Sequence, residues 1–360
     1  MRNKVLKDLS FLVSGLLVIF FTFGNTSSDR KIIYVCYPGG VHFDTIAKCY
    51  SKGQTLNFVE SSAGYTPLNR DNCRYHYHCW AEKLKSLRYT IQEIRENQLN
   101  DLQGFEALVC FDVPSSNVQV LKKYDKKKLF VYLMEPPVIK SWNYSKEIHE
   151  HFGTVFTWID DLVDNKKYFK FYEPQANFDF IGTKPFSERK LAVMLSGCFP
   201  KRYNIPHNLY IKRQEVVDFF EKNAPSEFDL FGFNWPKYKV YKGFTKSHTE
   251  TFGNYKFAIC FENTSHLQGY ITGHKIFNPM RCGAVPVFQG ATNITDHIPT
   301  SCFIDARQFE TIRDLYDHLK SITEEQYNEY IKNIKEFLDS PQAHLFSPEK
   351  FADDFIFKMS

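Results

Sequence analysis

One stretch of the chain, residues 255–290, constrains the fold more than any other. It reads YKFAICFENTSHLQGYITGHKIFNPMRCGAVPVFQG. Residues 257–261 form an apolar run typical of a buried strand, a polar loop follows, a helix is predicted from Thr272, and 284–288 form a second apolar run. A strand, loop, helix and strand in this order indicate a parallel sheet, in which ligands bind at the carboxyl ends of the strands and beside helix N-termini. The function must explain the polar residues gathered there, which are Glu262, Asn263, Tyr270, Thr272 and Lys275.

The same alternation of strand and helix extends through most of the chain. The apolar runs that predict further strands are residues 31–37, 107–111, 129–133, 154–158, 191–195, 228–231 and 302–304. Helical patterns are found at 80–99, 117–124, 146–151, 209–222 and 311–338. Residues 171–190 contain Pro, Gly, Asn and Ser, which indicates a connection between two units. The 360 residues therefore predict two Rossmann-like α/β domains with a cleft between them, and the last residues are expected to pack back onto the first domain.

The N-terminal segment has the pattern of a membrane-entering sequence. Three basic residues within the first seven precede an apolar run at 9–23. An uncleaved signal anchor and a cleaved signal peptide both have this pattern, and we favour the anchor because the bulky Phe21 and Phe23 make a poor cleavage site. We expect a cytoplasmic tail (1–8), a transmembrane signal anchor (9–24) and a stem (25–30). The positive-inside rule then predicts a single-pass type II membrane protein, in a Golgi-type lumen if the source is eukaryotic or infects eukaryotes.

Composition argues against several classes of function. The net charge of +4, with acids and bases interspersed, is not typical of a nucleic-acid-binding protein. The nine cysteines form no CxxC pair and match no zinc pattern, and no D-x-D clamp for a nucleotide-bound divalent ion occurs. Four N-x-S/T sequences, at Asn25, Asn143, Asn263 and Asn293, are compatible with a secretory lumen. An enzyme of this composition that used a nucleotide sugar would stabilise the leaving diphosphate with basic residues and helix N–H groups.

Three residues outside the polar loop have the chemistry that such a reaction needs. Lys275 lies near a predicted helix N-terminus, where a phosphate is favoured, although an exposed helix lysine gives the same pattern. Arg213 lies in the helix predicted at 209–222, and a guanidinium binds two phosphate oxygens at once, although a solvated basic face is the simpler explanation. Glu135 follows the strand predicted at 129–133, and two prolines fix its turn. A carboxylate there can act as a general base, but a surface glutamate at a turn is the alternative.

Taken together, these residues resemble the α1,3-fucosyltransferase family (glycosyltransferase family 10). The family signature is approximately YKF-x-x-x-FEN…GY-[IV]-TEK-[IL]…G-x-VP-[VI]-x-x-G, and the matching residues are 255–257, 261–263, 269–272, 275–276, 283–287 and Gly290. Residues 212–213, 229–232 with Trp235, and 241–243 with Lys246 also follow the order of the family, and 134–136 are similar to its E-x-P element. The good matches cover residues 190–310, and weaker ones extend back to residue 31.

The resemblance implies a GT-B fold with an acceptor-binding domain (31–175), a linker (176–190), a GDP-fucose-binding domain (191–335) and a C-terminal helical tail (336–360). It implies an inverting, metal-independent transfer of fucose from GDP-fucose to a hydroxyl of a glycan or glycoconjugate, in α1,3 linkage and with no other cofactor. Glu135 would then be the base, and Arg213 and Lys275 would neutralise the diphosphate. The remaining donor-binding residues implied by the resemblance are Glu262, Asn263, Tyr270, Thr272 and His274.

The chain departs from the family within the predicted donor pocket. Where the family has T-E-K, this sequence has Thr272-Gly273-His274-Lys275, so the carboxylate that would bind sugar or ribose is lost, or is replaced by His274 or by Glu262. Pro279 removes a backbone donor from the next helix and should bend or shorten it. Two alternatives therefore stay open. One is a GT-B enzyme that uses a different nucleotide sugar, and the other is a catalytically silent sugar-binding relative.

Overall fold

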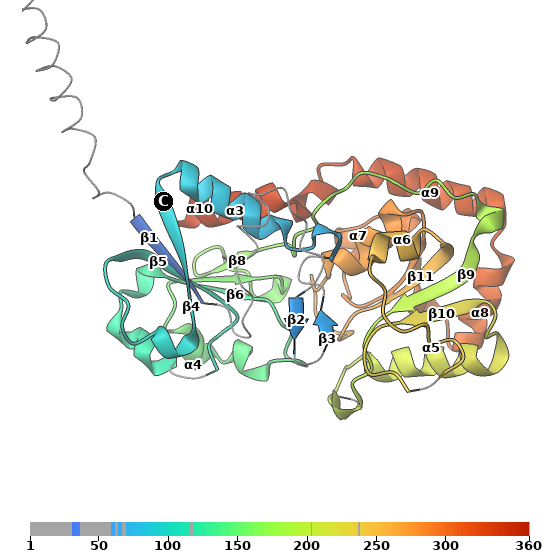
Figure 1. Ribbon diagram of the computed structural model, residues 1–360, viewed down its shortest axis with the longest axis horizontal. Helices are drawn as coiled ribbons and strands as arrows, with labels where there is room; N and C mark the ends of the chain where they lie inside the picture. Colours follow the sequence, from blue (N-terminus) through green and yellow to red (C-terminus); the bar gives the residue numbers. More distant parts are fainter. Residues whose placement is uncertain are drawn as a thin grey trace, which may run out of the picture.

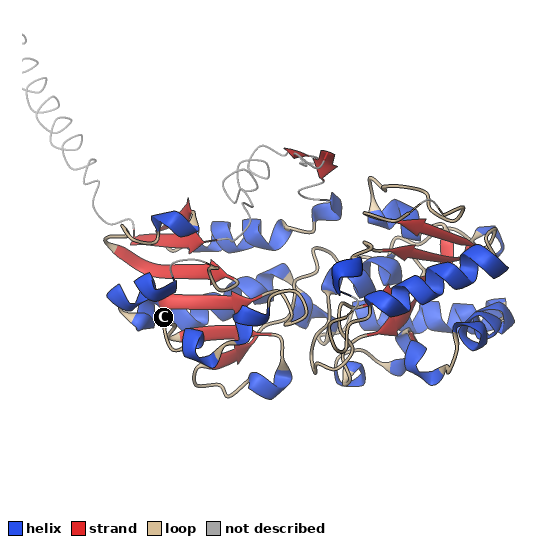
Figure 2. Ribbon diagram, turned by 90° about the horizontal axis from the view of Figure 1, so that it is seen from below, coloured by secondary structure: helices blue, strands red, loops and turns tan. Residues whose placement is uncertain are grey.

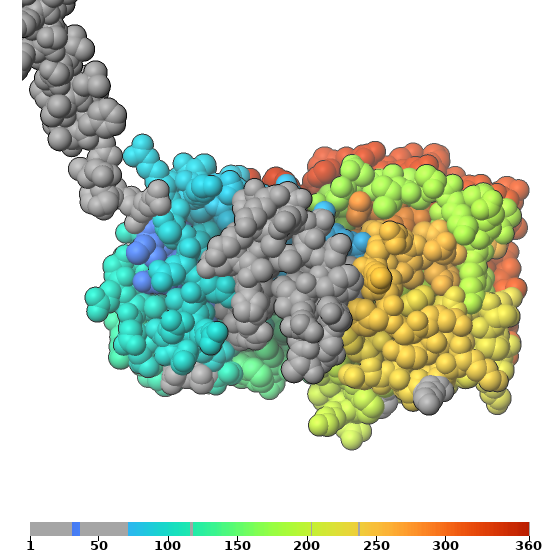
Figure 3. Space-filling view, in the orientation of Figure 1, coloured from blue at the N-terminus to red at the C-terminus, as the bar shows by residue number. Residues whose placement is uncertain are grey.

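Two α/β domains lie side by side along the long axis of the molecule (Figure 1). The computed structural model describes residues 31–36, 59–61, 64–66, 70–115, 118–202, 204–236 and 238–359, so the predicted tail, anchor and stem lie outside the described residues. Within these ranges, no helix is both long enough and apolar enough to cross a bilayer. The space-filling view shows the same division, with blue to green over one domain and yellow to red over most of the other (Figure 3).

The N-terminal domain is built on a parallel sheet of six described strands in the order β4-β1-β5-β6-β7-β8. In chain order they are β1 (Lys31–Cys36), β4 (Tyr89–Ile94), β5 (Phe105–Phe111), β6 (Leu129–Leu133), β7 (Thr154–Thr157) and β8 (Tyr168–Lys170). The central strands β5 and β6 are buried almost throughout, as expected for a parallel sheet that is covered on both faces. A separate antiparallel pair, β2 (Val59–Ser61) and β3 (Gly64–Thr66), precedes β4 in the chain.

The edges of this sheet differ from the sequence prediction. Residues 80–99 were expected to form one helix, but α3 (Tyr75–Ser86) ends early and β4 follows it. Arg88 has a φ of 66°, which turns the chain between the two elements. Strand β4 is partly exposed along most of its length, so its sequence lacks the apolar run that identifies a central strand. The edge strand β8 has only three residues and was not predicted.

The C-terminal domain has a second parallel sheet, in the order β10-β9-β11-β12-β13. Its strands are β9 (Lys190–Leu195), β10 (Phe228–Phe231), β11 (Tyr255–Phe261), β12 (Val285–Gln289) and β13 (Ile304–Asp305). The predicted strand at 302–304 is wrong in part, because Thr300–Cys302 is a 3-10 helix and β13 begins after it. The helices are α5 (Tyr210–Asn223), α6 (His248–Phe252), α7 (Gly273–Arg281), α8 (Ile312–Ser321) and α9 (Glu324–Leu338), and Figure 2 shows helices flanking both sheets.

The chain crosses between the domains twice. After β8 it enters the C-terminal domain, and after α9 it returns, so that α10 (Pro348–Met359) lies against α3 (Figure 1). Phe351 and Phe355 of α10 belong to the core of the N-terminal domain, which confirms the expectation that the last residues pack back onto it. The two crossings contact each other, because the backbone N–H of Gln175 donates to the carbonyl of Phe346 at 2.7 Å.

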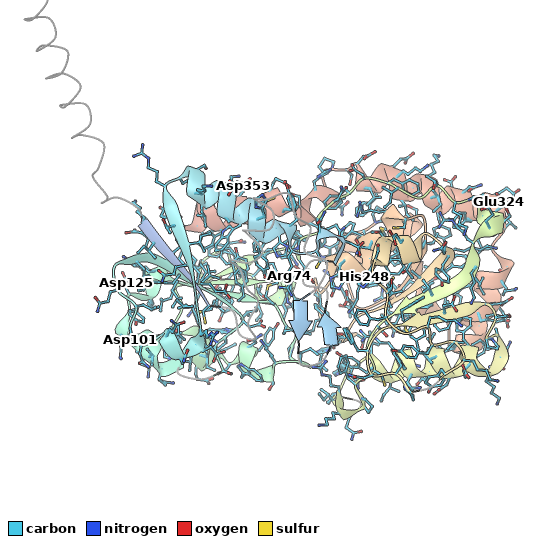
Figure 4. The ribbon with its side chains drawn as sticks, viewed as in Figure 1. Arg74, Asp101, Asp125, His248, Glu324 and Asp353 are labelled. Atoms are coloured by element: carbon cyan, nitrogen blue, oxygen red, sulfur yellow. The ribbon has the colours of Figure 1, made fainter. Side chains whose placement is uncertain are left out.

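A side chain of the N-terminal domain caps a helix of the C-terminal domain. The carboxylate of Asp71 accepts hydrogen bonds from Ser247 Oγ (2.7 Å), the backbone N–H of His248 (2.7 Å) and Thr249 Oγ1 (2.8 Å) at the start of α6. Figure 4 labels Arg74 and His248 on the two sides of this boundary. The contact holds the two domains together beside the cleft.

Candidate active site

The carboxyl ends of strands from both sheets meet at a cavity of about 460 Å³ between the domains. Residues that follow β6 line it from the N-terminal domain, and residues that follow β9, β10 and β11 line it from the C-terminal domain, together with α5 and the N-terminus of α7. The predicted site residues on its wall are Glu135, Arg213, Asn263, Tyr270, Thr272, His274 and Lys275. Seven of the eight predicted residues therefore share one cavity, and the eighth, Glu262, is buried behind the wall.

Glu135 is held at the cavity by a buried carboxylate that the sequence reasoning missed. Asp112, at the end of β5, accepts hydrogen bonds through Oδ1 from the backbone N–H groups of Met134 (2.7 Å) and Glu135 (3.0 Å). The same oxygen accepts from Asn143 Nδ2 (2.7 Å), and Oδ2 is paired with Lys140 Nζ at 2.7 Å. Asp112 has a φ of 67°, a conformation that aspartate adopts more readily than most residues. The backbone of the Glu135 turn is therefore fixed while its carboxylate lines the cavity.

The surroundings of Glu135 favour its protonated form. Burial raises the pKa of Glu135 above its ordinary value, and the charges of Asp112 and Glu173 raise it further. Lys140 and Lys275 oppose this shift. An ionised carboxylate with a raised pKa is a stronger base than an ordinary glutamate.

The predicted phosphate-binding cations lie together on the opposite wall, and both are anchored. Arg213 is 3 % exposed and donates to the carbonyl of Phe261 (2.7 and 3.2 Å) and to Asn263 Oδ1 (3.0 Å). Lys275 Nζ is 2.7 Å from Glu262 Oε2. Burial lowers the pKa of Lys275, and the charge of Glu262 opposes that change. With Glu262 ionised, the three side chains carry a net charge of +1 next to the N-terminus of α7, which suits an anionic ligand.

Glu262 holds this wall together and does not face the cavity. It is fully buried, and its carboxylate accepts hydrogen bonds from the backbone N–H of Thr272 (2.6 Å), Thr272 Oγ1 (2.7 Å) and Lys275 Nζ. Because these donors occupy both oxygens, Glu262 fixes the entry into α7 and the position of Lys275. The expectation that Glu262 shapes the pocket therefore holds only indirectly.

The other predicted donor-binding residues form a connected layer. Asn263 Nδ2 donates to the hydroxyl of Tyr270 (3.1 Å), whose ring packs on Trp158 of the N-terminal domain with centroids 4.3 Å apart. Thr272 is the N-cap residue of α7, as the predicted helix start required. Pro279 lies inside α7, which ends two residues later at Arg281, in agreement with the predicted short helix. His274 lines the cavity, with Nδ1 3.5 Å from Glu173 Oε1.

Several residues of the cavity wall were not predicted. Arg202 donates to the hydroxyl of Tyr210 at 2.8 Å and lies over the ring of Phe199, so it adds a third cation to the wall. The exposed rings of Phe233 and Phe244 lie 4.4 Å apart at the same cavity. Phe233 and Phe244 lie in loops and Arg202 ends a short 3-10 helix, and the Pro, Lys and Arg content of the segment after β9 was the only sequence signal for any of them. Aromatic rings with a guanidinium nearby provide a surface on which a planar base can stack.

Three of the four N-x-S/T asparagines have side-chain amides that are already engaged. Nδ2 of Asn143 donates to Asp112, Nδ2 of Asn263 donates to Tyr270, and Nδ2 of Asn293 donates to Asp160. An N-linked glycan attaches at this nitrogen, so glycosylation would break each of these contacts. The fourth, Asn25, lies outside the described residues.

Comparison with known proteins finds a family that part of the chain matches. Residues 186–346 match the model of the family described as glycosyltransferase family 10 (fucosyltransferase), C-terminal part. An α-(1,4)-fucosyltransferase of Arabidopsis thaliana is 33 % identical over 79 residues, which are 21 % of this chain and 19 % of the relative. A GDP-fucose protein O-fucosyltransferase 3 of Xenopus laevis is 38 % identical over 71 residues, which are 19 % of this chain and 15 % of the relative. The aligned segments thus span less than a fifth of either curated relative.

The similarity of fold extends over most of the chain. The crystal structure of an α1,3-fucosyltransferase superposes with a TM-score of 0.52 at 15 % identity, covering 93 % of this chain and 92 % of that one. The same type of enzyme with GDP superposes with a TM-score of 0.50 at 15 % identity and the same coverage. These likenesses concern the fold and agree with two parallel α/β domains facing a cleft. The predicted resemblance is confirmed for residues 186–346, which match the model of glycosyltransferase family 10 (fucosyltransferase).

Proposed function

We propose that this protein is an inverting fucosyltransferase that moves fucose from GDP-fucose to a hydroxyl group of a glycan and needs no metal ion. The observation that carries the proposal is a single cavity with a base candidate on one domain and two anchored cations on the other. Glu135 lines it from the N-terminal domain, and Arg213 and Lys275 line it from the C-terminal domain. The family match of residues 186–346 supports the choice of a fucosyl donor.

In the proposed reaction, Glu135 takes the proton of the acceptor hydroxyl. The acceptor oxygen attacks the anomeric carbon of fucose from the face opposite the diphosphate, and the bond between that carbon and the phosphate oxygen breaks. One displacement of this kind inverts the configuration at the anomeric carbon. The products are the fucosylated glycan and GDP, and Glu135 later releases its proton to water.

The negative charge that develops on the leaving diphosphate is met by Arg213, Lys275 and the N-terminus of α7. Both side chains are held in place before substrate binds, by Phe261 and Asn263 for Arg213 and by Glu262 for Lys275. Charges that are already oriented need little reorganisation as the leaving group forms, which is the main source of electrostatic catalysis. Independence from metal ions belongs to this proposal, because these groups would take the place of a divalent cation.

The cellular setting proposed from the sequence is a membrane. An anchor at residues 9–24 would hold the two domains on the lumenal side, where glycan acceptors are found. We propose a glycan or glycoconjugate as the acceptor and α1,3 as the linkage.

The test is a donor screen on the full chain purified in a mild detergent. Release of GDP from GDP-fucose in the presence of a glycan acceptor, unchanged by EDTA, is the expected result. Turnover of a UDP-sugar in place of GDP-fucose would replace the proposed donor, and loss of activity with EDTA would overturn metal independence. Binding of GDP-fucose with no turnover on any acceptor of a glycan array would indicate a silent sugar-binding protein.

A further inference from the structure

Glu173 is a second acidic residue at the cavity, and it lies on the first crossing between the two domains. It follows β8 by three residues and lines the same cavity as Glu135, Tyr270 and Lys275. Its side chain is 30 % exposed, and Oε1 lies 3.5 Å from His274 Nδ1. Nothing in the local sequence of Glu173 distinguishes it from an ordinary glutamate of a connecting segment.

The backbone around Glu173 is fixed to α7. Gln175, 3 % exposed, donates through Nε2 to Asn278 Oδ1 at 3.0 Å, and Asn278 is a buried residue of α7. One turn earlier in α7, a Cβ at Gly273 would lie 2.7 Å from the carbonyl oxygen of Glu173. Only glycine leaves room for this approach. Gly273 and His274, where this chain differs from the family signature, therefore both lie beside Glu173.

The carboxylate of Glu173 is repelled by that of Glu135 at the same cavity. It raises the pKa of Glu135 by repulsion between like charges, and it faces a site that suits an anionic diphosphate. Such a group is stabilised when its ligand offers hydrogen-bond donors there. The hydroxyl groups of a sugar are such donors, and bonds from hydroxyls to a carboxylate are stronger than those between neutral groups.

Neither alternative considered from the sequence can fill this role equally well. Glu262 is fully buried, and three hydrogen bonds from Thr272 and Lys275 occupy its carboxylate. His274 lies at the cavity but contacts Glu173, so its position suits it to orient that carboxylate. Glu173 has the charge, the exposure and the fixed backbone that contact with a ligand requires.

We propose that Glu173 binds hydroxyl groups of the sugar carried by the nucleoside diphosphate, and that His274 is the positioning residue that orients its carboxylate. The inference rests on the proposed function, because it concerns the sugar end of the same donor. It assigns recognition of the sugar to a residue outside the GDP-binding domain, on the crossing between the two domains. Gly273 then leaves room for the backbone of Glu173, and His274 orients the Glu173 carboxylate. The pocket thus keeps a sugar-binding carboxylate although the glutamate of the family signature is absent.

Calorimetric titration of the full chain with GDP and with GDP-fucose separates the sugar end from the nucleotide end. Glu173→Gln is expected to raise the Kd for GDP-fucose by about 10- to 100-fold, the range for a hydrogen bond to a charged group, and to leave the Kd for GDP within about twofold. Glu188→Gln is the matched control, because Glu188 is an exposed linker residue that does not line the cavity, and no change is expected. An equal loss of affinity for GDP and GDP-fucose in Glu173→Gln would overturn the assignment to the sugar.

Two variants of His274 test the positioning role. His274→Leu removes the contact and should raise the Kd for GDP-fucose by about 3- to 10-fold, whereas His274→Asn keeps a donor near the place of Nδ1 and should restore most of the affinity. Equal affinities for these two variants would refute the role of His274. If the unmodified protein binds neither GDP nor GDP-fucose, the proposed function fails. If it binds both and Glu173→Gln changes neither Kd, the proposed function stands and the inference about Glu173 is wrong.

Discussion

Glu135 and Glu262 occupy corresponding places in the two domains, yet their surroundings differ. Each follows a central strand of a parallel sheet, β6 in one domain and β11 in the other. Glu262 is fully buried and accepts three hydrogen bonds, one of them from Lys275. Glu135 lines the cavity, and burial and neighbouring carboxylates raise its pKa. The same position in the fold thus gives a structural counter-ion in one domain and a candidate base in the other.

The difference shows how a carboxylate at a strand end acquires its role. The carboxylate of Glu262 already accepts hydrogen bonds from a helix N-terminus and a lysine, and it turns no oxygen toward a ligand. A carboxylate whose backbone is held, but whose oxygens face a cavity, can exchange a proton with a ligand. In this protein, Asp112 accepts the backbone N–H groups of the Glu135 turn and leaves the Glu135 side chain available.

The largest expected effect comes from removing the candidate base. Glu135→Gln should lower kcat for fucosyl transfer by about 10²-fold or more, because the amide cannot take a proton from the acceptor. The Kd for GDP should change little, and the free energy of unfolding should not fall. Steady-state kinetics and calorimetry on the same preparation measure these quantities. A kcat near that of the unmodified enzyme would remove Glu135 from the mechanism.

Glu262→Gln should give the opposite pattern. The amide cannot accept from all three donors and leaves Lys275 without its buried counter-ion, so the free energy of unfolding should fall by about 2–4 kcal/mol. The loss of kcat should be smaller than for Glu135→Gln, because the base remains. Urea denaturation of both variants tests the contrast. Equal stability of the two variants would show that the surroundings of these carboxylates do not differ in the way described.

The pH profile tests the raised pKa of Glu135. Because the base must be ionised, kcat/KM should fall as the pH is lowered through the pKa of Glu135, and this fall should come at a higher pH than for an ordinary glutamate. Asp112→Asn removes a charge that raises this pKa, so the acid limb should move to lower pH. An acid limb that moves upward or stays in place would contradict the electrostatic explanation.

Lys140→Met should have the smallest effect of these substitutions. Lys140 is paired with Asp112 and lowers the pKa of Glu135 less than Asp112 raises it, so its removal should move the acid limb to higher pH by a smaller amount. The acid limb is expected to move in opposite directions in Asp112→Asn and Lys140→Met. A general loss of structure would not explain two opposite shifts. Shifts in the same direction would contradict this description of the base.

The sequence was sufficient to predict the central strands and the polar residues at their ends. Strand β6 has the predicted bounds, because a continuous apolar run identifies a strand that is buried on both faces. Strand β10 also has the predicted bounds, although it is an edge strand and contains Asp229. The edge strands of the N-terminal sheet escaped prediction because β4 is partly exposed and β8 is short. Of the cavity wall, the motif residues could be predicted from their order in the chain.

Other functional candidates could not be predicted, because only the fold brings them to the site. Asp112 lies 23 residues before Glu135, and no local pattern links the two. Glu173 and His274 come from different elements about 100 residues apart, and they meet because Gln175 binds Asn278. Arg202 follows β9 within a segment whose basic residues looked alike in the sequence.

The paired crossings between the domains make the cleft tolerant of damage to the chain. Gln175 on one crossing is hydrogen-bonded to Phe346 on the other, and the rings of Tyr172 and Phe346 pack with centroids 4.8 Å apart. A protease that cuts one crossing leaves the second peptide connection, with α10 still seated on α3. The nicked protein would stay in one piece, with both walls of the cavity still facing each other. Only the cut ends of the chain would gain freedom to move.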